Sequence, residues 1–105
     1  MAKMDFKTLH ELIDLDGVSG NEGPVREYIK KKIAPFVDNV SVDKLGDLIC
    51  HKKGKGPSLM LAAHMDEIGL MVKRVESSGR IYISALGGIN SLNMIGQTVK
   101  VVGDE

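Results

Sequence analysis

The spacing of apolar residues predicts two helices in the first third of the chain. Apolar residues first recur every three or four positions behind Asp5, a common N-cap type, and Gly17 follows the last of them. A second stripe begins after Ser19 and ends at a proline. Ser19 and Glu22 have capping-box spacing, and Asn21 is a competing cap. The two amphipathic stripes consist of Phe6, Leu9, Leu12 and Ile13, and of Val25, Ile29 and Ile33.

From residue 37 onward the apolar positions follow the period of β-strands. Val40 and Val42 alternate with polar residues, and residues 48–51 return as a partner strand after a turn at residues 44–47. Leu59–Ala63 is an uninterrupted apolar run after a Gly-Lys-Gly-Pro turn, which is typical of a strand buried on both faces. We therefore expect an edge hairpin followed by an inner strand of an α/β sandwich.

After Gly69 the chain is rich in short β-type runs, at residues 70–72, 81–83 and 99–102, with no helical pattern between them. Glycine-containing turns separate these runs, as is typical of the start of a small barrel. The pair Gly87-Gly88 is interpreted as a bend that requires positive φ. The predicted fold class is therefore α/β, with a β-rich region following the sandwich.

The inner strand ends at His64, and two carboxylates, Asp66 and Glu67, follow closely. In extended backbone, side chains repeat with a period of two, so His64 and Asp66 project to one side while Met65 and Glu67 project to the other. A metal-bound imidazole usually donates its second ring N–H to a carboxylate or carbonyl, and Asp66 is placed to be that partner or a ligand itself. The alternative is an ordinary solvated or hydrogen-bonded histidine at the end of a strand.

Composition is that of a small globular domain. The 105 residues are 43% hydrophobic and 27% charged, and the 14 basic and 14 acidic residues cancel. A balanced charge gives no field that attracts nucleic acid or an anionic membrane, and neither partner is predicted. The chain start has no apolar signal region, and no stretch reaches the roughly 20 apolar residues of a membrane span. The expected location is the cytoplasm.

Residues 62–69, Ala-Ala-His-Met-Asp-Glu-Ile-Gly, resemble the first metal-binding motif of the tetrahedral (TET) and glutamyl aminopeptidases, whose members are often labelled endoglucanases or cellulases. Further segments match in the same order: Gly-Val-Ser-Gly-Asn-Glu at 17–22, Asp-Lys-Leu-Gly-Asp at 43–47 and Gly-Gly-Ile at 87–89. Ile89 replaces the aromatic residue of many members. The resemblance runs from about Leu9 to Val102, nearly the whole chain.

The resemblance implies a metal-dependent aminopeptidase that uses a metal-bridging water to release N-terminal residues from peptides. His64 would bind one of two divalent metal ions, zinc or cobalt, and Asp66 would be the catalytic carboxylate that orients it. Residues 1–68 would be the N-terminal part of the metallopeptidase catalytic domain. Residues 69–105 would be the start of an inserted, incomplete β-rich dimerisation domain, through which such enzymes form dimers and then tetrahedral dodecamers.

Most of the family's metal ligands, and its general-base glutamate, lie beyond the residues matched here. A hydrolytic centre needs about three protein ligands and an open position, so we expect the 105-residue chain to be inactive alone. The alternative function is a non-catalytic assembly or binding module derived from such an enzyme. Glycoside hydrolysis fits less well, because Asp66 and Glu67 would point to opposite faces of a strand.

Overall fold

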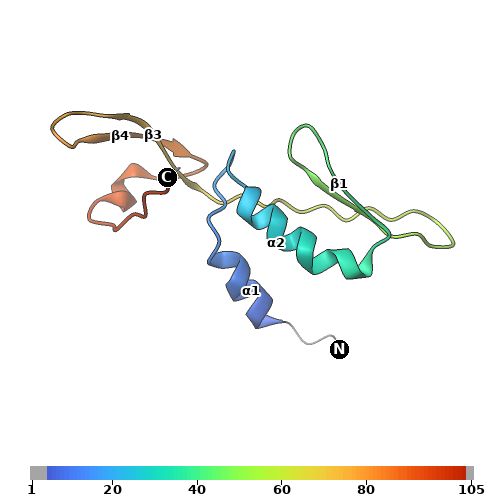
Figure 1. Ribbon diagram of the computed structural model, residues 1–105. Coiled ribbons are helices and arrows are strands. Elements are labelled where there is room, and N and C mark those ends of the chain that lie inside the picture. Colours follow the sequence, from blue (N-terminus) through green and yellow to red (C-terminus); the bar gives the residue numbers. More distant parts are fainter. Residues whose placement is uncertain (1–4, 104–105) are drawn as a thin grey trace. The chain divides into compact units, whose positions relative to one another are not determined.

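The computed structural model describes residues 5–103, and the chain divides into two compact units, the first ending at Glu67 and the second beginning at Ile68. The first unit contains the helices α1 (Phe6–Ile13) and α2 (Gly23–Ile33), the short 3-10 helix η1 (Ala34–Phe36) and the strands β1 (Asn39–Val42) and β2 (Leu48–His51) (Figure 1). The second contains β3 (Gly69–Val75), β4 (Ile81–Leu86) and the 3-10 helix η2 (Ser91–Met94). The domain roles assigned to residues 1–68 and 69–105 stay predictions, and residues 1–4 and 104–105 lie outside the described range.

Helix α1 begins where the sequence predicts. The Asp5 carboxylate accepts hydrogen bonds from the backbone N–H groups of Lys7 and Thr8, at 3.1 and 3.3 Å, which satisfies donors that a helix start leaves unpaired. Side chains also link α1 to α2. Glu11 of α1 accepts a hydrogen bond from the Tyr28 hydroxyl and lies 3.0 Å from the Lys32 ammonium. The two predicted helices are confirmed, and polar contacts join them.

The predicted capping box of α2 is wrong. Glu22 is the N-cap residue and its side chain caps no helical N–H; it accepts instead from the Gly20 N–H, at 2.7 Å. Ser19 is not the cap, because α2 begins at Gly23 with Glu22 before it, and the Ser19 hydroxyl donates to Asp66, a residue distant in sequence. Pro24 in the first turn suits the helix start, since its φ is already helical and a first-turn N–H has no partner to lose. The stripe was therefore predicted correctly, while the predicted cap was wrong.

Strands β1 and β2 form the predicted antiparallel hairpin, with Val42 opposite Leu48 at the turn end. The Asp43 carboxylate closes the turn by accepting from two backbone N–H groups, those of Leu45 and Asp47, at 2.9 Å each. Gly46 has φ +95°, a conformation that favours glycine. Its carbonyl accepts a hydrogen bond of 3.1 Å from Arg26, which ties the hairpin turn to α2.

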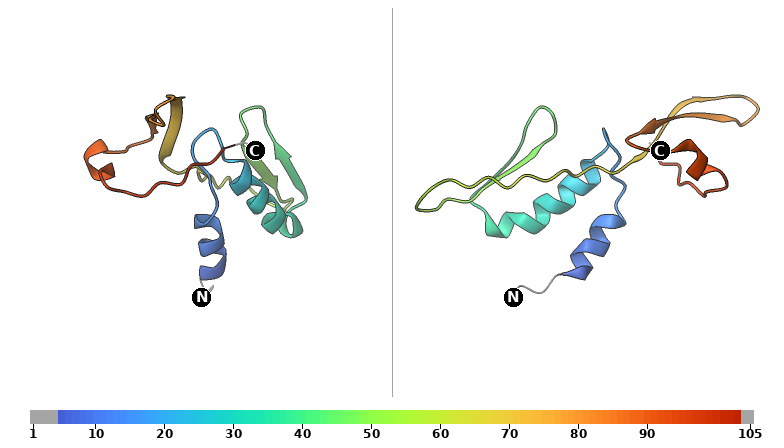
Figure 2. Two further views of the ribbon diagram at one scale, coloured as in Figure 1. Left: turned by 60° about the vertical axis from the view of Figure 1, so that its left-hand side comes forward. Right: turned by 180° about the vertical axis from the view of Figure 1, so that it is seen from behind.

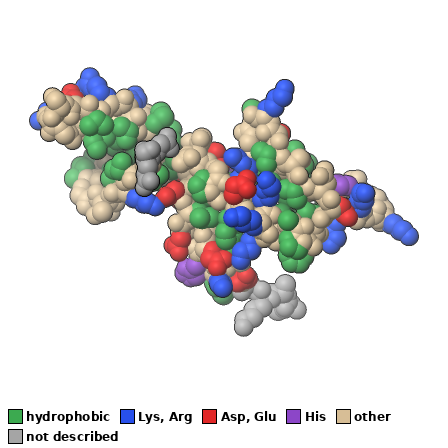
Figure 3. Space-filling model, in the orientation of Figure 1, with side chains coloured by type: hydrophobic (Ala, Val, Ile, Leu, Met, Phe, Trp, Pro, Cys, Tyr) green, Lys and Arg blue, Asp and Glu red, His purple; other side chains and the backbone are tan. Residues whose placement is uncertain are grey.

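The expectation that Leu59–Ala63 is a buried inner strand is wrong for the part of the chain that the structure describes. The segment is extended but pairs with no described strand, and Leu59, Met60 and Leu61 are 85 to 87% exposed. A strand needs a neighbour to accept and donate its ladder hydrogen bonds, and no described segment occupies that position. Exposed hydrophobic side chains are also visible on the face of the molecule shown in Figure 3.

The hydrophobic core of residues 5–103 is small. Val25 of α2, 7% exposed, is its only buried hydrophobic side chain. Gly17 lies against it: a Cβ at Gly17 would stand 2.6 Å from the Val25 Cγ2. The close approach of the Gly17 backbone to α2 therefore requires a residue without a side chain.

In the second unit, β3 and β4 form an antiparallel hairpin with a register shift between Val72 and Arg74 (Figure 2). The guanidinium of Arg74 lies over the ring of its partner Tyr82, 4.3 Å from the ring centroid. Gly87 has the predicted positive φ, +82°, whereas Gly88 does not. The expected strand at residues 99–102 is wrong, because this run has no strand partner among residues 5–103. A barrel is therefore not formed by the described residues.

Among residues 5–103, no helix is both long enough and apolar enough to cross a membrane.

Candidate metal-ligand site

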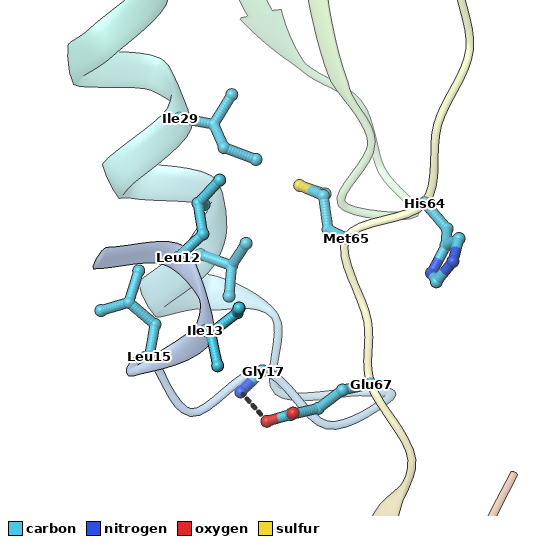
Figure 4. A pocket seen from close by; sticks show the side chains of 9 residues that line it. Leu12, Ile13, Leu15, Gly17, Ile29, His64, Met65 and Glu67 are labelled. Carbon is cyan, nitrogen blue, oxygen red and sulfur yellow. Dashed lines mark hydrogen bonds between the residues drawn. The ribbon is translucent and has the colours of Figure 1, made fainter. Parts of the chain in front are cut away.

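Two segments about 50 residues apart in sequence meet at the candidate site. Residues 17–19 precede α2, and residues 64–67 end the extended segment. A parallel bridge pairs Val18 with Glu67, and the Glu67 N–H donates to the Gly17 carbonyl at 2.8 Å. The Gly17 N–H lies 3.4 Å from a Glu67 carboxylate oxygen (Figure 4). This bridge fixes the register between the two segments.

Side chains alternate along residues 64–67, as the period of extended backbone predicts. Met65 points toward the helices, whereas His64 points to the opposite side of the chain (Figure 4). Met65 lines an apolar groove of about 260 Å³ together with residues of both helices, including Leu12, Val25 and Ile29. His64 is thereby left on the outer face, with its side chain 85% exposed. The packing of Met65 decides which side His64 occupies.

The imidazole of His64 is held by Asp66, in the convergence that the sequence predicts. Its Nδ1 lies 2.9 Å from a carboxylate oxygen of Asp66 and 3.0 Å from the Asp66 backbone carbonyl. Both partners are acceptors when the carboxylate is ionised, so Nδ1 must be the donor. The neutral ring then carries its lone pair on Nε2, which makes no hydrogen bond to any described residue. This is the tautomer and the orientation that a metal-binding imidazole needs.

Ser19 completes this arrangement, and reasoning from the sequence missed it. The Ser19 hydroxyl donates to the second carboxylate oxygen of Asp66, at 2.5 Å. Hydrogen bonds from Ser19 and then from His64 hold the pKa of Asp66 below its ordinary value, because both stabilise the anion. The capping-box spacing of Ser19 and Glu22 gave the serine a local role, and no sequence signal linked it to Asp66.

A second hollow, of about 160 Å³, lies beside His64. Its lining includes the carboxylate residues Glu22, Asp47 and Asp66. Even so, residues 5–103 contain no group of three or more histidine, cysteine, aspartate or glutamate side chains arranged to hold a metal ion. The donor set therefore fits one metal ligand, His64, with a carboxylate behind it, and supplies no complete metal centre.

Comparison with known proteins shows which family the chain resembles. A family model described as M42 glutamyl aminopeptidase matches residues 46–105. A protein of Acetivibrio thermocellus named as an aminopeptidase is 48% identical over 95 residues, which are 90% of this chain and 29% of that protein. The chain thus spans less than a third of the length of this relative.

Two solved structures are similar in fold as well as in sequence. A Thermotoga maritima protein described as an endoglucanase is 46% identical, with a TM-score of 0.73 over 77% of this chain and 27% of that one. A TET aminopeptidase from the marine sediment archaeon Thaumarchaeota archaeon SCGC AB-539-E09 is 33% identical, with a TM-score of 0.77 over 83% of this chain and 25% of that one. The resemblance stated from the sequence is confirmed. The chain belongs to the M42 glutamyl aminopeptidase family.

Proposed function

We propose that the chain forms part of a metal-dependent aminopeptidase in which His64 binds one divalent metal ion through Nε2. The observation that carries this proposal is the hydrogen bond of 2.9 Å between His64 Nδ1 and the Asp66 carboxylate. It fixes the tautomer with the Nε2 lone pair exposed to solvent. Membership of an aminopeptidase family supports peptides with a free N-terminus as the substrate class.

A pair of divalent metal ions, zinc or cobalt, would supply Lewis-acid chemistry there, polarising the substrate carbonyl and lowering the pKa of water. The residues of this chain would have a more limited role. His64 offers one ligand nitrogen, and Asp66 holds the ring so that this nitrogen faces outward. The remaining ligands and the general base would come from outside residues 5–103, since the described residues contain no cluster that could complete a site.

For the complete enzyme we propose a homo-oligomer in which dimers assemble into a tetrahedral dodecamer, located in the cytoplasm. The second unit would be the start of the β-rich domain that mediates dimerisation. Family membership supports this proposal, together with the β3–β4 hairpin, which provides two strands for a larger sheet. Residues 69–105 would thus serve assembly, and residues 1–68 the metal site.

A non-catalytic assembly or binding module is the second candidate function. The absence of a group of three potential ligands among residues 5–103 favours it for the 105-residue chain. On this hypothesis His64 and Asp66 keep their geometry, but no peptide is hydrolysed.

Metal binding is tested by titrating the 105-residue chain with zinc while NMR follows the imidazole nitrogens. Zinc should shift the Nε2 signal of His64 and leave its Nδ1 bonded to hydrogen. The matched control is His51→Ala, because His51 is another exposed imidazole and lies in β2. Zinc binding should be lost in His64→Ala and kept in His51→Ala. Equal loss in both variants would contradict the assignment of His64.

Catalysis is tested separately with a panel of aminoacyl-anilides, with and without zinc or cobalt, on protein of verified mass. Metal-dependent release that disappears in His64→Ala supports a catalytic site. No release, with zinc binding at His64 intact, supports the module hypothesis for this chain. Release that His64→Ala leaves unchanged would refute the proposed role of His64.

A further inference from the structure

We propose that Ser19 is a positioning residue for the candidate metal ligand: its hydroxyl fixes the Asp66 carboxylate in the orientation that engages His64 Nδ1. The inference rests on the proposed function only in giving His64 a metal to bind. The contacts themselves belong to this chain. Asp66 receives the His64 N–H on one carboxylate oxygen, at 2.9 Å, and the Ser19 O–H on the other, at 2.5 Å.

The two bonds act on different oxygens, and this determines what Ser19 does. Rotation of an aspartate carboxyl about its last torsion is broad and roughly two-fold, so a single bond to His64 leaves the group free to turn. A second bond to the opposite oxygen removes that freedom. The carboxylate that holds the imidazole then has its plane fixed by Ser19, which does not contact the ring.

The backbone holds Ser19 in place for this role. The Asn21 N–H donates to the Val18 carbonyl at 2.8 Å, which closes a turn with Ser19 and Gly20 as its central residues. Gly20 has φ +89°, the conformation that a glycine at this turn position provides without strain. Val18 is also bridged to Glu67. Ser19 directly follows Val18, and Asp66 directly precedes Glu67, so the bridge fixes the backbone next to both residues. The hydroxyl thus approaches the carboxylate from an ordered turn.

The test compares Ser19→Ala and Ser19→Thr in the 105-residue chain. NMR correlation of the ring nitrogens at about pH 8 reports the His64 tautomer. The native chain and Ser19→Thr, which keeps the hydroxyl, should show hydrogen on Nδ1. Ser19→Ala should shift part of the population toward hydrogen on Nε2, and the Asp66 backbone carbonyl, 3.0 Å from Nδ1, should hold the rest. The zinc affinity of Ser19→Ala should fall by about tenfold, the lower end of the range for mutating a residue that orients a metal ligand.

A structural control separates positioning from general loosening of the loop. Glu67→Ala removes the side-chain contact to the Gly17 N–H but keeps the Ser19 hydroxyl and the backbone bridge. It should leave the tautomer of His64 unchanged. Hydrogen exchange at the Glu67 amide, which donates to the Gly17 carbonyl, reports whether the bridge forms in each variant.

Each outcome decides the proposal. A tautomer shift in Ser19→Ala alone, with the Glu67 amide protected, supports it. The proposal is overturned if Ser19→Ala keeps the native tautomer, if Ser19→Thr behaves like alanine, or if Glu67→Ala shifts the ring as much. An unprotected Glu67 amide in the native chain would also overturn it. If the tautomer depends on Ser19 but zinc does not bind His64, the positioning role stands and the proposed function fails.

Discussion

Replacing Gly17 with alanine is the sharpest test of how the candidate site is joined to the helices. The added Cβ would stand 2.6 Å from the Val25 Cγ2, whereas carbon atoms in ordinary contact are about 3.5 to 4.0 Å apart. Overpacking of this kind costs about 1 to 3 kcal/mol. Gly17 is not among the glycines with positive φ, so alanine fits its backbone and restricts the unfolded chain, a gain of about 0.4 to 1 kcal/mol. The net loss of stability should be about 1 to 2 kcal/mol.

The matched control is Gly54→Ala, which also adds one methyl group to the first unit. A Cβ at Gly54 meets no atom within 4 Å, and Gly54 is not among the glycines with positive φ, so alanine restricts only the unfolded chain. This variant should be neutral or more stable. The two substitutions are chemically the same, so opposite signs isolate the contact with Val25.

The assay is urea unfolding followed by circular dichroism, with hydrogen exchange at the Glu67 amide as a local reporter of the bridge. With a urea slope of about 1 to 3 kcal/mol per molar, the Gly17→Ala midpoint should fall by roughly 0.3 to 2 molar. Val25→Ala removes the methyl group that the new Cβ would meet. The double variant should therefore be more stable than the sum of the single changes predicts, by about 1 kcal/mol.

Two results would refute this reasoning. If Gly17→Ala is as stable as Gly54→Ala, the close approach of Gly17 to α2 does not constrain the chain. If the double variant is strictly additive, Val25 is not what the methyl group meets. Loss of Glu67 amide protection in Gly17→Ala, with the helices intact, would locate the damage at the bridge itself.

Two further predictions concern acid stability and association. Hydrogen bonds from Tyr28 and then Lys32 hold the pKa of Glu11 below its ordinary value of 4.5. The stability that these bonds contribute is therefore present above about pH 4.5. It is lost as the pH falls through the lower pKa of the folded state. Glu11→Gln should therefore flatten the decline of the urea midpoint between about pH 5 and pH 2, and an unchanged decline would show that Glu11 contributes nothing. The extended segment at residues 59–63 exposes apolar side chains and unpaired backbone groups, so the chain should self-associate in sedimentation experiments. Met60→Lys should reduce that association, and a compact native monomer would contradict the prediction.

Features that depend on neighbouring residues could be predicted from the sequence. The Asp5 cap and the apolar stripes located both helices. Alternation located the β1–β2 hairpin, and short β-rich runs between turns located β3 and β4. The pairing of His64 with Asp66 was also predictable, because extended backbone places alternate side chains on one side whatever lies around them.

Predictions that needed a distant partner failed. Leu59–Ala63 has the composition of an inner strand, yet no described strand pairs with it. The strand predicted at residues 99–102 is absent from the described sheets for the same reason. A strand is completed by hydrogen bonds to a neighbour, which its own residues cannot specify. The capping signal of Ser19 also failed, because α2 begins later in the chain, and the hydroxyl instead contacts Asp66, a partner that the local sequence does not specify.

The sequence by itself determined the helices, the hairpins, the family and the His64–Asp66 pair, because each depends on short-range spacing or on matching motifs. Only the tertiary structure decided that the turn at Ser19 lies against residues 64–67. The hydrogen bonds between Gly17 and Glu67 join residues 50 positions apart. Gly17 also lies close to Val25, which is possible because glycine has no side chain. Contacts across such a separation depend on how the chain packs, and spacing along the sequence does not encode them.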